Sequence, residues 1–250
     1  MKALITGASS GIGRDIARVL SAKGYDLILV ARRLDRLEDL KNELSCDVQT
    51  ISLDLAQEES CFRLYNLVKD QEIDILINNA GFAVYGDFDQ TDLGKELELI
   101  NTNIKAVHIL TKLFLQDFKQ RDRGYILNVA SSAAFLPGPL MAAYYASKAY
   151  VLRLTEAVHE ELRKTNSKVY VGALCPGPVH TEFAKVANIK FGVKALNSPH
   201  VARYTVDQML KHKHLIIPGV VMKAAFIFMK IMPHKILLSF LYKIQKEKFV

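Results

Sequence analysis

The first 20 residues combine a short apolar run, a glycine-rich loop and an amphipathic helix, and this order restricts the fold more than any other feature. The apolar run is residues 2–6, and the loop Thr6–Gly13 has the glycine spacing G-x-x-x-G-x-G. Apolar residues then recur at helical spacing up to Leu20. Glycines let a backbone approach a pyrophosphate closely, and a helix N-terminus offers free N–H groups to it. The start of the chain therefore predicts a dinucleotide-binding strand, loop and helix.

The second apolar run, residues 26–30, ends in Ala31 and two arginines, Arg32 and Arg33. Enzymes that use NAD usually carry a carboxylate near this point for the ribose 2′-hydroxyl. Two guanidinium groups, each with a planar fork of donors, suit a 2′-phosphate instead. The pattern favours NADP(H). It leaves NAD(H) open, because the two arginines could simply begin a solvated, charged helix.

Two further apolar runs end in polar residues. Residues 48–53 lead to Asp54 and Leu55, and residues 73–77 lead to the turn Asn78–Gly81. The Asp54 carboxylate could accept a hydrogen bond from an adenine amino group, or it could cap the following helix. Strands alternate with helical stretches up to about residue 217. This alternation predicts an α/β, Rossmann-type, doubly wound parallel sheet with helices on both faces.

Tyr144 and Lys148 are four residues apart, which is about one turn of a helix. Their side chains would therefore leave the same helix face. An ammonium about 4 Å from a phenol, at an effective dielectric near 20, favours the phenolate by roughly 4 kcal/mol. This would lower the phenol pKa by about three units, before desolvation is counted. We expect Tyr144 to titrate near working pH and to act as a general acid-base.

Together these motifs resemble the single-domain branch of the short-chain dehydrogenase/reductase family. The resemblance covers residues 2–181 and also includes Asn103, Ser131 and the segment Pro176–Thr181. It implies a catalytic tetrad, a cofactor-contacting set and an NADP(H)-dependent oxidoreductase activity. The implied tetrad is Asn103, Ser131, Tyr144 and Lys148. The predicted cofactor contacts are Gly7, Ser9, Ser10, Gly11, Ile12, Gly13, Arg32, Arg33, Asp54, Leu55, Asn79, Ala80, Gly81, Tyr144, Lys148, Pro176, Gly177, Val179 and Thr181.

The resemblance also implies a role for each tetrad residue. Ser131 would position a substrate carbonyl oxygen, and Tyr144 would protonate the developing alkoxide. Lys148 would lower the pKa of Tyr144 and bind the nicotinamide ribose. The amide of Asn103 would hold a water that links Lys148 to solvent. Oxidation of an alcohol would run the same steps in reverse.

Apolar residues flank the expected reaction centre and predict a pocket for an apolar carbonyl or alcohol. We expect Phe82, Phe135, Met141 and Phe183 to contact the substrate together with Ser131. Each of these apolar residues could instead belong to the core. Two alternative enzymes are a 3-oxoacyl-thioester reductase and a lipid or steroid-type hydroxyl dehydrogenase. An alternative of another class is a non-catalytic dinucleotide-binding regulator.

The last part of the chain departs from the common family ending. Residues 1–218 are expected to form the catalytic domain, and residues 219–250 a helical extension that is apolar and basic. Pro233 would separate two helices. The extension could cover the cleft or the domain, form the interface of a homodimer or homotetramer, or lie on a membrane surface. We favour packing on the domain or on a partner, because the apolar run is too interrupted to span a bilayer.

Charge and composition exclude several function classes. Residues 211–250 hold eight lysines and one acidic residue, so the rest of the chain balances at 25 basic and 25 acidic residues. A catalytic domain without net basic character argues against nucleic-acid binding. Three isolated cysteines and the lack of an H-x-x-H or H-E-x-x-H pattern predict no catalytic metal. With no signal peptide expected before the first strand, we predict a cytoplasmic protein that could be peripheral to a membrane.

Overall fold

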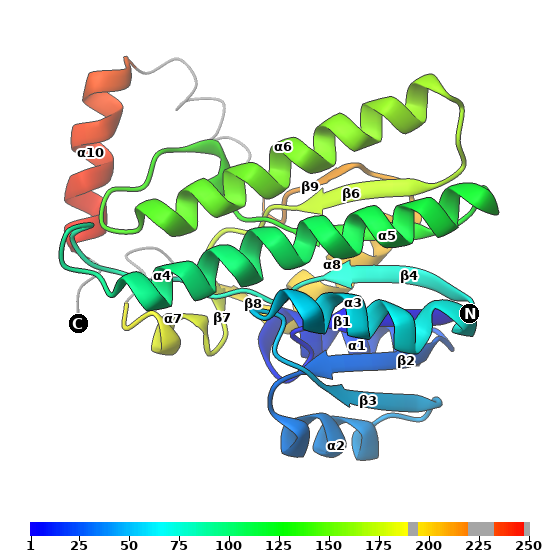
Figure 1. Cartoon of the computed structure of the whole chain (residues 1–250). Helices are drawn as coiled ribbons and strands as arrows, with labels where there is room; N and C mark the ends of the chain where they lie inside the picture. The colour runs from blue at the N-terminus through cyan, green and yellow to red at the C-terminus, as the bar shows by residue number, and fades with distance from the viewer. Residues whose placement is uncertain (190–194, 220–232, 248–250) are drawn as a thin grey trace.

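A computed structural model describes residues 1–189, 195–219 and 233–247. Its centre is a parallel sheet of seven strands in the order β3-β2-β1-β4-β5-β6-β9 (Figure 1). The strands are β1 (Lys2–Thr6), β2 (Asp26–Ala31), β3 (Val48–Ser52), β4 (Ile73–Asn78), β5 (Tyr125–Val129), β6 (Tyr170–Leu174) and β9 (Leu215–Ile216). Strand order reverses between β1 and β4, which is where open α/β sheets bind ligands.

Helices cover both faces of the sheet, and their apolar stripes make two core layers. One face is covered by α1 (Gly11–Ala22), α2 (Leu34–Glu43) and α8 (Ser198–Leu210). The other is covered by α3 (Glu58–Val68), α5 (Val107–Gln120) and α6 (Ala142–Lys164). In α5, for example, Leu110, Phe114 and Phe118 recur at helical spacing and are almost fully buried. This arrangement confirms the predicted doubly wound α/β fold.

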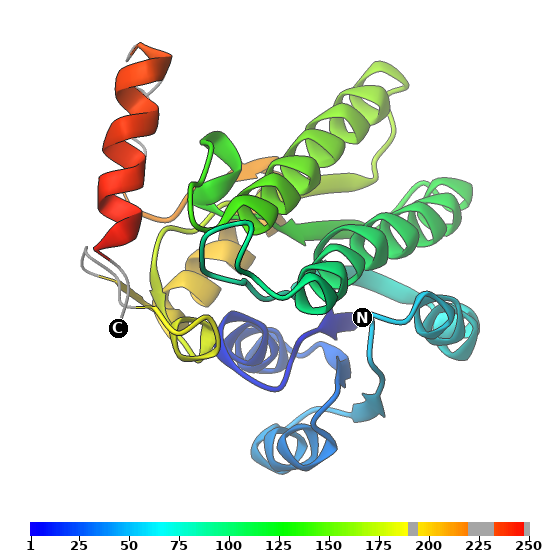
Figure 2. The same ribbon diagram turned by 60° about the vertical axis from the view of Figure 1, so that its left-hand side comes forward.

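Shorter elements gather at the carboxyl ends of the strands (Figures 1 and 2). They are α4 (Leu93–Ile100), a π-helical turn η2 (Asn101–Ala106), the 3₁₀ turn η3 (Ser132–Phe135), α7 (Phe183–Val186), and a small two-stranded sheet of β7 (Val179–His180) and β8 (Leu196–Asn197). A further 3₁₀ turn, η1 (Lys69–Gln71), precedes β4. The carboxyl edge of the sheet is therefore the side where connecting segments can form a site.

The helix α10 (His234–Lys246) begins directly after Pro233 and stands beside the start of α6 (Figures 1 and 2). Its inward face carries Leu237, Leu241 and Gln245, which follow one another at intervals of four and are all buried. The first of the two helices expected in the tail falls outside the described residues. Among the described residues, no helix is both long enough and apolar enough to cross a membrane.

Candidate active site

A cleft of about 410 Å³ opens over the carboxyl edge of the sheet. One end lies between the glycine loop and the end of β2, and the other is lined by apolar side chains from α6 and α7. Every predicted cofactor contact except Gly13 lines this cleft. The sheet thus brings together residues that lie up to 174 positions apart in the chain, from Gly7 to Thr181.

The glycine loop has the geometry that close approach to a phosphate needs. Gly7 and Gly11 have φ values of 65° and 55°, a region that side chains with a Cβ rarely adopt. Gly13 does not face the cleft, because it packs against Asn79, where an added Cβ would lie 2.4 Å from Nδ2. The N-cap of α1, Ser10, makes no side-chain capping bond. The first N–H groups of α1 therefore suit an anionic ligand such as a pyrophosphate.

Asp54 makes a local turn. One of its carboxylate oxygens accepts a hydrogen bond from the Ala56 N–H at 3.1 Å. The N-cap of α3 is Gln57, without a side-chain capping bond, so Asp54 is not the cap of that helix. The Asp54 side chain lines the cleft beside Leu55, which leaves the adenine contact as its predicted role.

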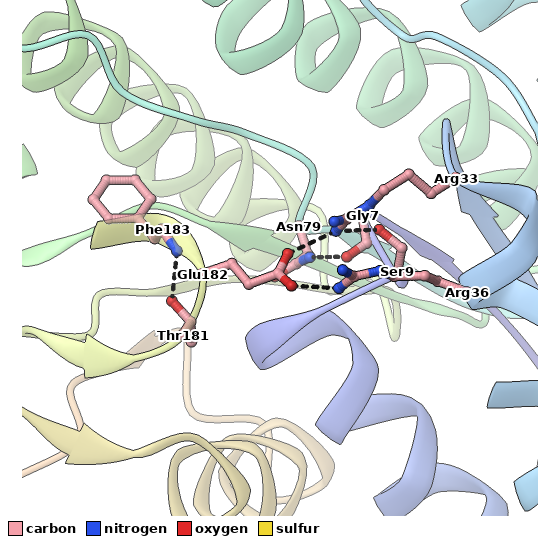
Figure 3. Close-up of polar contacts among 8 residues, drawn as sticks. All are labelled: Gly7, Ser9, Arg33, Arg36, Asn79, Thr181, Glu182 and Phe183. Atoms are coloured by element: carbon pink, nitrogen blue, oxygen red, sulfur yellow. Dashed lines mark hydrogen bonds and ion pairs between the residues drawn. The ribbon is translucent and has the colours of Figure 1, made fainter. Parts of the chain in front are cut away.

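Arg33, one of the two arginines predicted to favour NADP(H), has an acidic partner that the sequence did not indicate. The Arg33 guanidinium donates to Ser9 Oγ at 3.1 Å and to a carboxylate oxygen of Glu182 at 2.9 Å (Figure 3). Arg36 donates to the other oxygen of Glu182. The bond from Arg36, and then that from Arg33, lowers the pKa of Glu182 to about 2. Glu182 is therefore ionised at any working pH.

Tyr144 and Lys148 lie on the buried face of α6, with 8% and 5% of their surfaces exposed. The Lys148 ammonium donates to the Val129 carbonyl at 2.8 Å and lies 5.9 Å from the centroid of the Tyr144 ring. Burial raises the pKa of Tyr144, against a hydrogen bond from Ser131 that lowers it. Burial also lowers the pKa of Lys148 to about 8. The expected lowering of the Tyr144 pKa is therefore wrong for this structure, since desolvation outweighs the hydrogen bond from Ser131.

Asn103 lies within the π-helical turn η2 and is fully buried. Its amide nitrogen donates to the Phe82 carbonyl at 2.9 Å and to Ser147 Oγ at 3.1 Å, and its oxygen accepts from the Phe82 N–H at 3.1 Å. Both amide hydrogens are therefore in use. The side chain fixes the loop after β4, and its expected role of holding a water stays a prediction.

Ser131 follows β5 and is the N-cap of η3. Its hydroxyl oxygen accepts a hydrogen bond from the Ala133 N–H at 3.1 Å. The next residue, Ser132, donates its N–H to the Pro176 carbonyl at 2.8 Å. This bond ties the Ser131 loop to the segment that follows β6. Ser131, Tyr144 and Lys148 all line the same cleft.

The apolar end of the cleft is lined by three of the four apolar residues predicted to bind substrate: Phe82, Met141 and Phe183. The ring centroid of Phe183 lies 5.3 Å from that of Tyr144. The prediction that Phe135 contacts the substrate is wrong, because its ring packs on a separate cluster that includes Val151 and Cys175. Phe135 therefore packs on this cluster and does not line the cleft.

Sequence reasoning also missed Tyr145, which lines the cleft next to Tyr144. The amide nitrogen of Gln245, on α10, donates to the Tyr145 hydroxyl. The Tyr85 hydroxyl donates to the backbone carbonyl oxygen of Gln245 at 2.8 Å. The tail helix is therefore bonded to two aromatic residues beside the apolar end of the cleft. Over the ranges that the structure describes, no cluster of His, Cys, Asp and Glu is arranged to hold a metal ion.

Comparison with known proteins agrees with this geometry. A family model described as short chain dehydrogenase matches residues 1–190. The very-long-chain 3-oxoacyl-CoA reductase of Homo sapiens is 33% identical over 192 residues, which are 74% of this chain and 61% of that protein. The chain thus spans about three fifths of the length of that relative.

Two solved structures are similar over nearly the whole chain. A short-chain dehydrogenase from Sphingobium yanoikuyae in complex with NADPH has a TM-score of 0.81 and 30% identity, covering 93% of this chain and 96% of that chain. The bulky-bulky ketone specific alcohol dehydrogenase from Comamonas testosteroni has a TM-score of 0.78 and 28% identity, covering 93% and 94%.

Proposed function

This chain belongs to the short-chain dehydrogenase/reductase family, and we propose that it transfers a hydride between NADP(H) and the carbonyl or alcohol carbon of an apolar substrate. The observation that carries this proposal is the position of Ser131, Tyr144 and Lys148. All three line one cleft, which has the glycine loop at one end and apolar side chains at the other. The N–H groups of the loop would donate to a phosphate. A reacting carbonyl placed there would meet the two hydroxyl groups.

The chain's own residues supply positioning and proton transfer. Ser131 donates a hydrogen bond to the carbonyl oxygen and fixes its orientation. Tyr144, whose pKa burial raises, remains protonated and donates its proton to the developing alkoxide. Lys148 binds the ribose hydroxyls and holds a positive charge under the site at pH values below about 8. Bound NADP(H) supplies the hydride.

The preference for NADP(H) rests on the residues at the end of β2. Arg32 and Arg33 line the cleft, and Arg33 already bonds Ser9 of the glycine loop. A 2′-phosphate at this point would meet guanidinium forks and a hydroxyl, which are the donors that phosphate oxygens accept from. NAD(H) would find no matching carboxylate from β2, whose last residue is Ala31.

The substrate class follows from the apolar end of the cleft, where Phe82, Met141, Phe183 and Ile189 converge. A 3-oxoacyl thioester is the second candidate, favoured by the 33% identity to the human very-long-chain 3-oxoacyl-CoA reductase. Both substrates present a carbonyl next to apolar surface. They differ in the bulky polar carrier that a thioester brings to the cleft entrance.

A panel of carbonyls and alcohols, followed at the NADPH absorbance band and repeated with NADH, tests this function. The panel contains an apolar ketone, an aldehyde, a steroid ketone and a 3-oxoacyl-CoA. Turnover of at least one carbonyl with NADPH, faster than with NADH, is the expected result. Tight NADPH binding without turnover of any member would contradict the activity and favour a non-catalytic dinucleotide-binding regulator.

Assembly and location form a further part of the proposal. Packing of α10 against its own domain is supported by the bonds of Gln245. Its outer face exposes Ile236 and Phe240 among lysines, a pattern that a partner subunit or an anionic membrane surface would cover. We expect a homodimer or homotetramer in the cytoplasm, and light scattering tests the oligomeric state. Flotation with anionic liposomes at low salt tests peripheral membrane contact.

A further inference from the structure

Glu182 lies where the guanidinium groups of Arg33 and Arg36 converge. Each of its two carboxylate oxygens accepts a hydrogen bond from a different guanidinium group, one from Arg33 and one from Arg36 (Figure 3). The same Arg33 nitrogen that donates to Glu182 also donates to Ser9 of the glycine loop, at 3.1 Å. The carboxylate is thus bound by the donors that stand next to the loop.

These contacts join two parts of the chain that are 149 residues apart. Arg33 and Arg36 come from the start of α2, whereas Glu182 directly precedes α7. All three side chains are partly exposed, at 42% for each arginine and 36% for the glutamate. Water and a soluble ligand can therefore reach the cluster. An exposed ion pair of this kind is weak enough for a competing anion to displace it.

A 2′-phosphate and the Glu182 carboxylate need the same donors. Both are oxyanions, one tetrahedral and one planar, that accept paired bonds from guanidinium groups. Ser9, Arg33 and Glu182 line one end of the same cleft. A phosphate that bonds Ser9 and Arg33 there would lie beside the carboxylate, and two anions at that distance repel each other.

We propose that Glu182 is a specificity-determining residue, which competes with the 2′-phosphate of NADP(H) for Arg33 and Arg36. The inference rests on the proposed function in that it takes the ligand to be a nicotinamide dinucleotide. Glu182 weakens NADP(H) binding and leaves NAD(H) binding nearly unchanged, because only the former brings a phosphate to the two arginines. Glu182 thereby reduces the preference for NADP(H) over NAD(H) that the arginines alone would give.

The test uses two probes that differ only in the 2′-phosphate, adenosine 2′,5′-bisphosphate and adenosine 5′-monophosphate. Their dissociation constants are measured by calorimetry on the full chain at fixed ionic strength, without substrate or turnover. Glu182→Gln keeps the shape of the side chain and removes its charge. We expect this variant to bind the bisphosphate about three- to tenfold more tightly, the range that displacing two exposed ion pairs allows. Binding of the monophosphate should change by less than about twofold.

Glu43→Gln is a matched control, because Glu43 is also a partly exposed carboxylate paired with an arginine, Arg18, but outside the cleft. It should leave both constants unchanged. Arg36→Gln should weaken bisphosphate binding and reduce the gain from Glu182→Gln. Glu182→Ala repeats the test with a smaller side chain, and circular dichroism checks that each variant is folded.

Unchanged or weaker bisphosphate binding in folded Glu182→Gln and Glu182→Ala would overturn the inference. Equal tightening of both probes would also overturn it, because a general charge effect does not discriminate the 2′-phosphate. If neither probe bound to the wild-type chain, the proposed dinucleotide function itself would fail, and the inference with it. The two failures are therefore distinguishable in one data set.

Discussion

The Lys148 ammonium and the Val129 carbonyl oxygen are 2.8 Å apart, in a place where the lysine is only 5% exposed. One backbone carbonyl solvates this buried cation where bulk water would offer several partners, so burial lowers the pKa of Lys148 to about 8. The unfolded chain would hold the same lysine near its ordinary pKa of about 10.4. Below pH 8 Lys148 is protonated in both the folded and the unfolded chain, and the folded state carries the full cost of a buried charge.

Replacing Lys148 by Met should therefore stabilise the fold while it abolishes useful turnover. At pH 7 we expect the free energy of unfolding to rise by about 1–3 kcal/mol, since an apolar side chain removes the desolvation cost. The gain over wild type should shrink as pH rises from 8 to 10.5, because the wild-type lysine loses its proton in that window. Urea denaturation at several pH values measures both effects. Lys112→Met, on the exposed face of α5, is the control.

Equal stability of Lys148→Met and wild type at pH 7 would contradict the assigned pKa.

In the active protein the same titration should appear in the rate. We expect kcat/KM for carbonyl reduction to fall as pH rises through about 8, because the cation beneath the ribose site is lost. The measurement is the pH profile of NADPH oxidation with saturating cofactor.

Replacing Tyr144 by Phe tests the proton donor directly. The change removes one hydroxyl from a buried ring that packs on Phe183, so the fold should be retained. Loss of a general acid costs about 10²–10⁴-fold in rate. We expect a fall in kcat of that size with NADPH binding within about twofold of wild type. Rapid-quench turnover and NADPH fluorescence titration measure the two quantities.

Tyr145→Phe is the matched control for that experiment, because it removes the same atom one residue further on. The Tyr145 hydroxyl bonds Gln245 of α10, so its loss should affect the tail and leave most of the turnover. If the two variants lost activity equally, the assignment of the acid to Tyr144 would fail.

Local sequence patterns were sufficient to predict the sheet and the glycine loop, and the family resemblance supplied most of the predicted cleft lining. Strands and helices could be read from apolar periodicity, and the carboxyl edge of a parallel sheet brings loop residues together without further information. Thr181 was assigned to the same site as Gly7 because of the family resemblance, and both residues line one cleft.

Other parts of the site depend on contacts that no local pattern encodes. Glu182 is bonded by Arg33 and Arg36 across about 150 residues, and an isolated Glu after Thr181 resembles any surface acid. The Tyr144 pKa was expected to fall because spacing on a helix shows which charges are near, whereas burial depends on the whole packed domain. Phe135 was misplaced for a similar reason, since an apolar residue beside a site can face either the cleft or the core.

Replacing Gly13 by Ala should weaken dinucleotide binding although Gly13 does not face the cleft. An added Cβ would lie 2.4 Å from Asn79 Nδ2 and 2.6 Å from the Gly7 carbonyl oxygen. Relief of this clash would move Gly7 and the start of α1, and we expect about 1–3 kcal/mol of destabilisation. Thermal unfolding and NADPH titration measure the loss. Gly94→Ala, in the exposed start of α4, would place its Cβ 3.2 Å from Asp92 Oδ1 and outside the cleft, so it should leave NADPH binding unchanged.

The bonds of the tail helix predict a change in substrate binding that leaves the cofactor untouched. Gln245 is 1% exposed, and it joins α10 to Tyr145 and Tyr85 at the apolar end of the cleft. Gln245→Ala removes the bond to Tyr145 and leaves a gap, so α10 should pack less firmly there. We expect KM for an apolar ketone to rise about three- to tenfold, equivalent to about 0.7–1.4 kcal/mol of lost binding, while the NADPH dissociation constant stays constant.

Lys246→Ala is the matched control, because Lys246 is the next residue and is exposed to solvent. It removes a long side chain from the same turn of α10 without touching either tyrosine. We expect it to retain the wild-type KM and NADPH affinity. A Gln245→Ala variant with unchanged KM, in a folded protein, would show that α10 takes no part in forming the substrate end of the cleft. A parallel rise in KM for both variants would instead assign the effect to the tail as a whole, because only the Gln245 side chain bonds Tyr145.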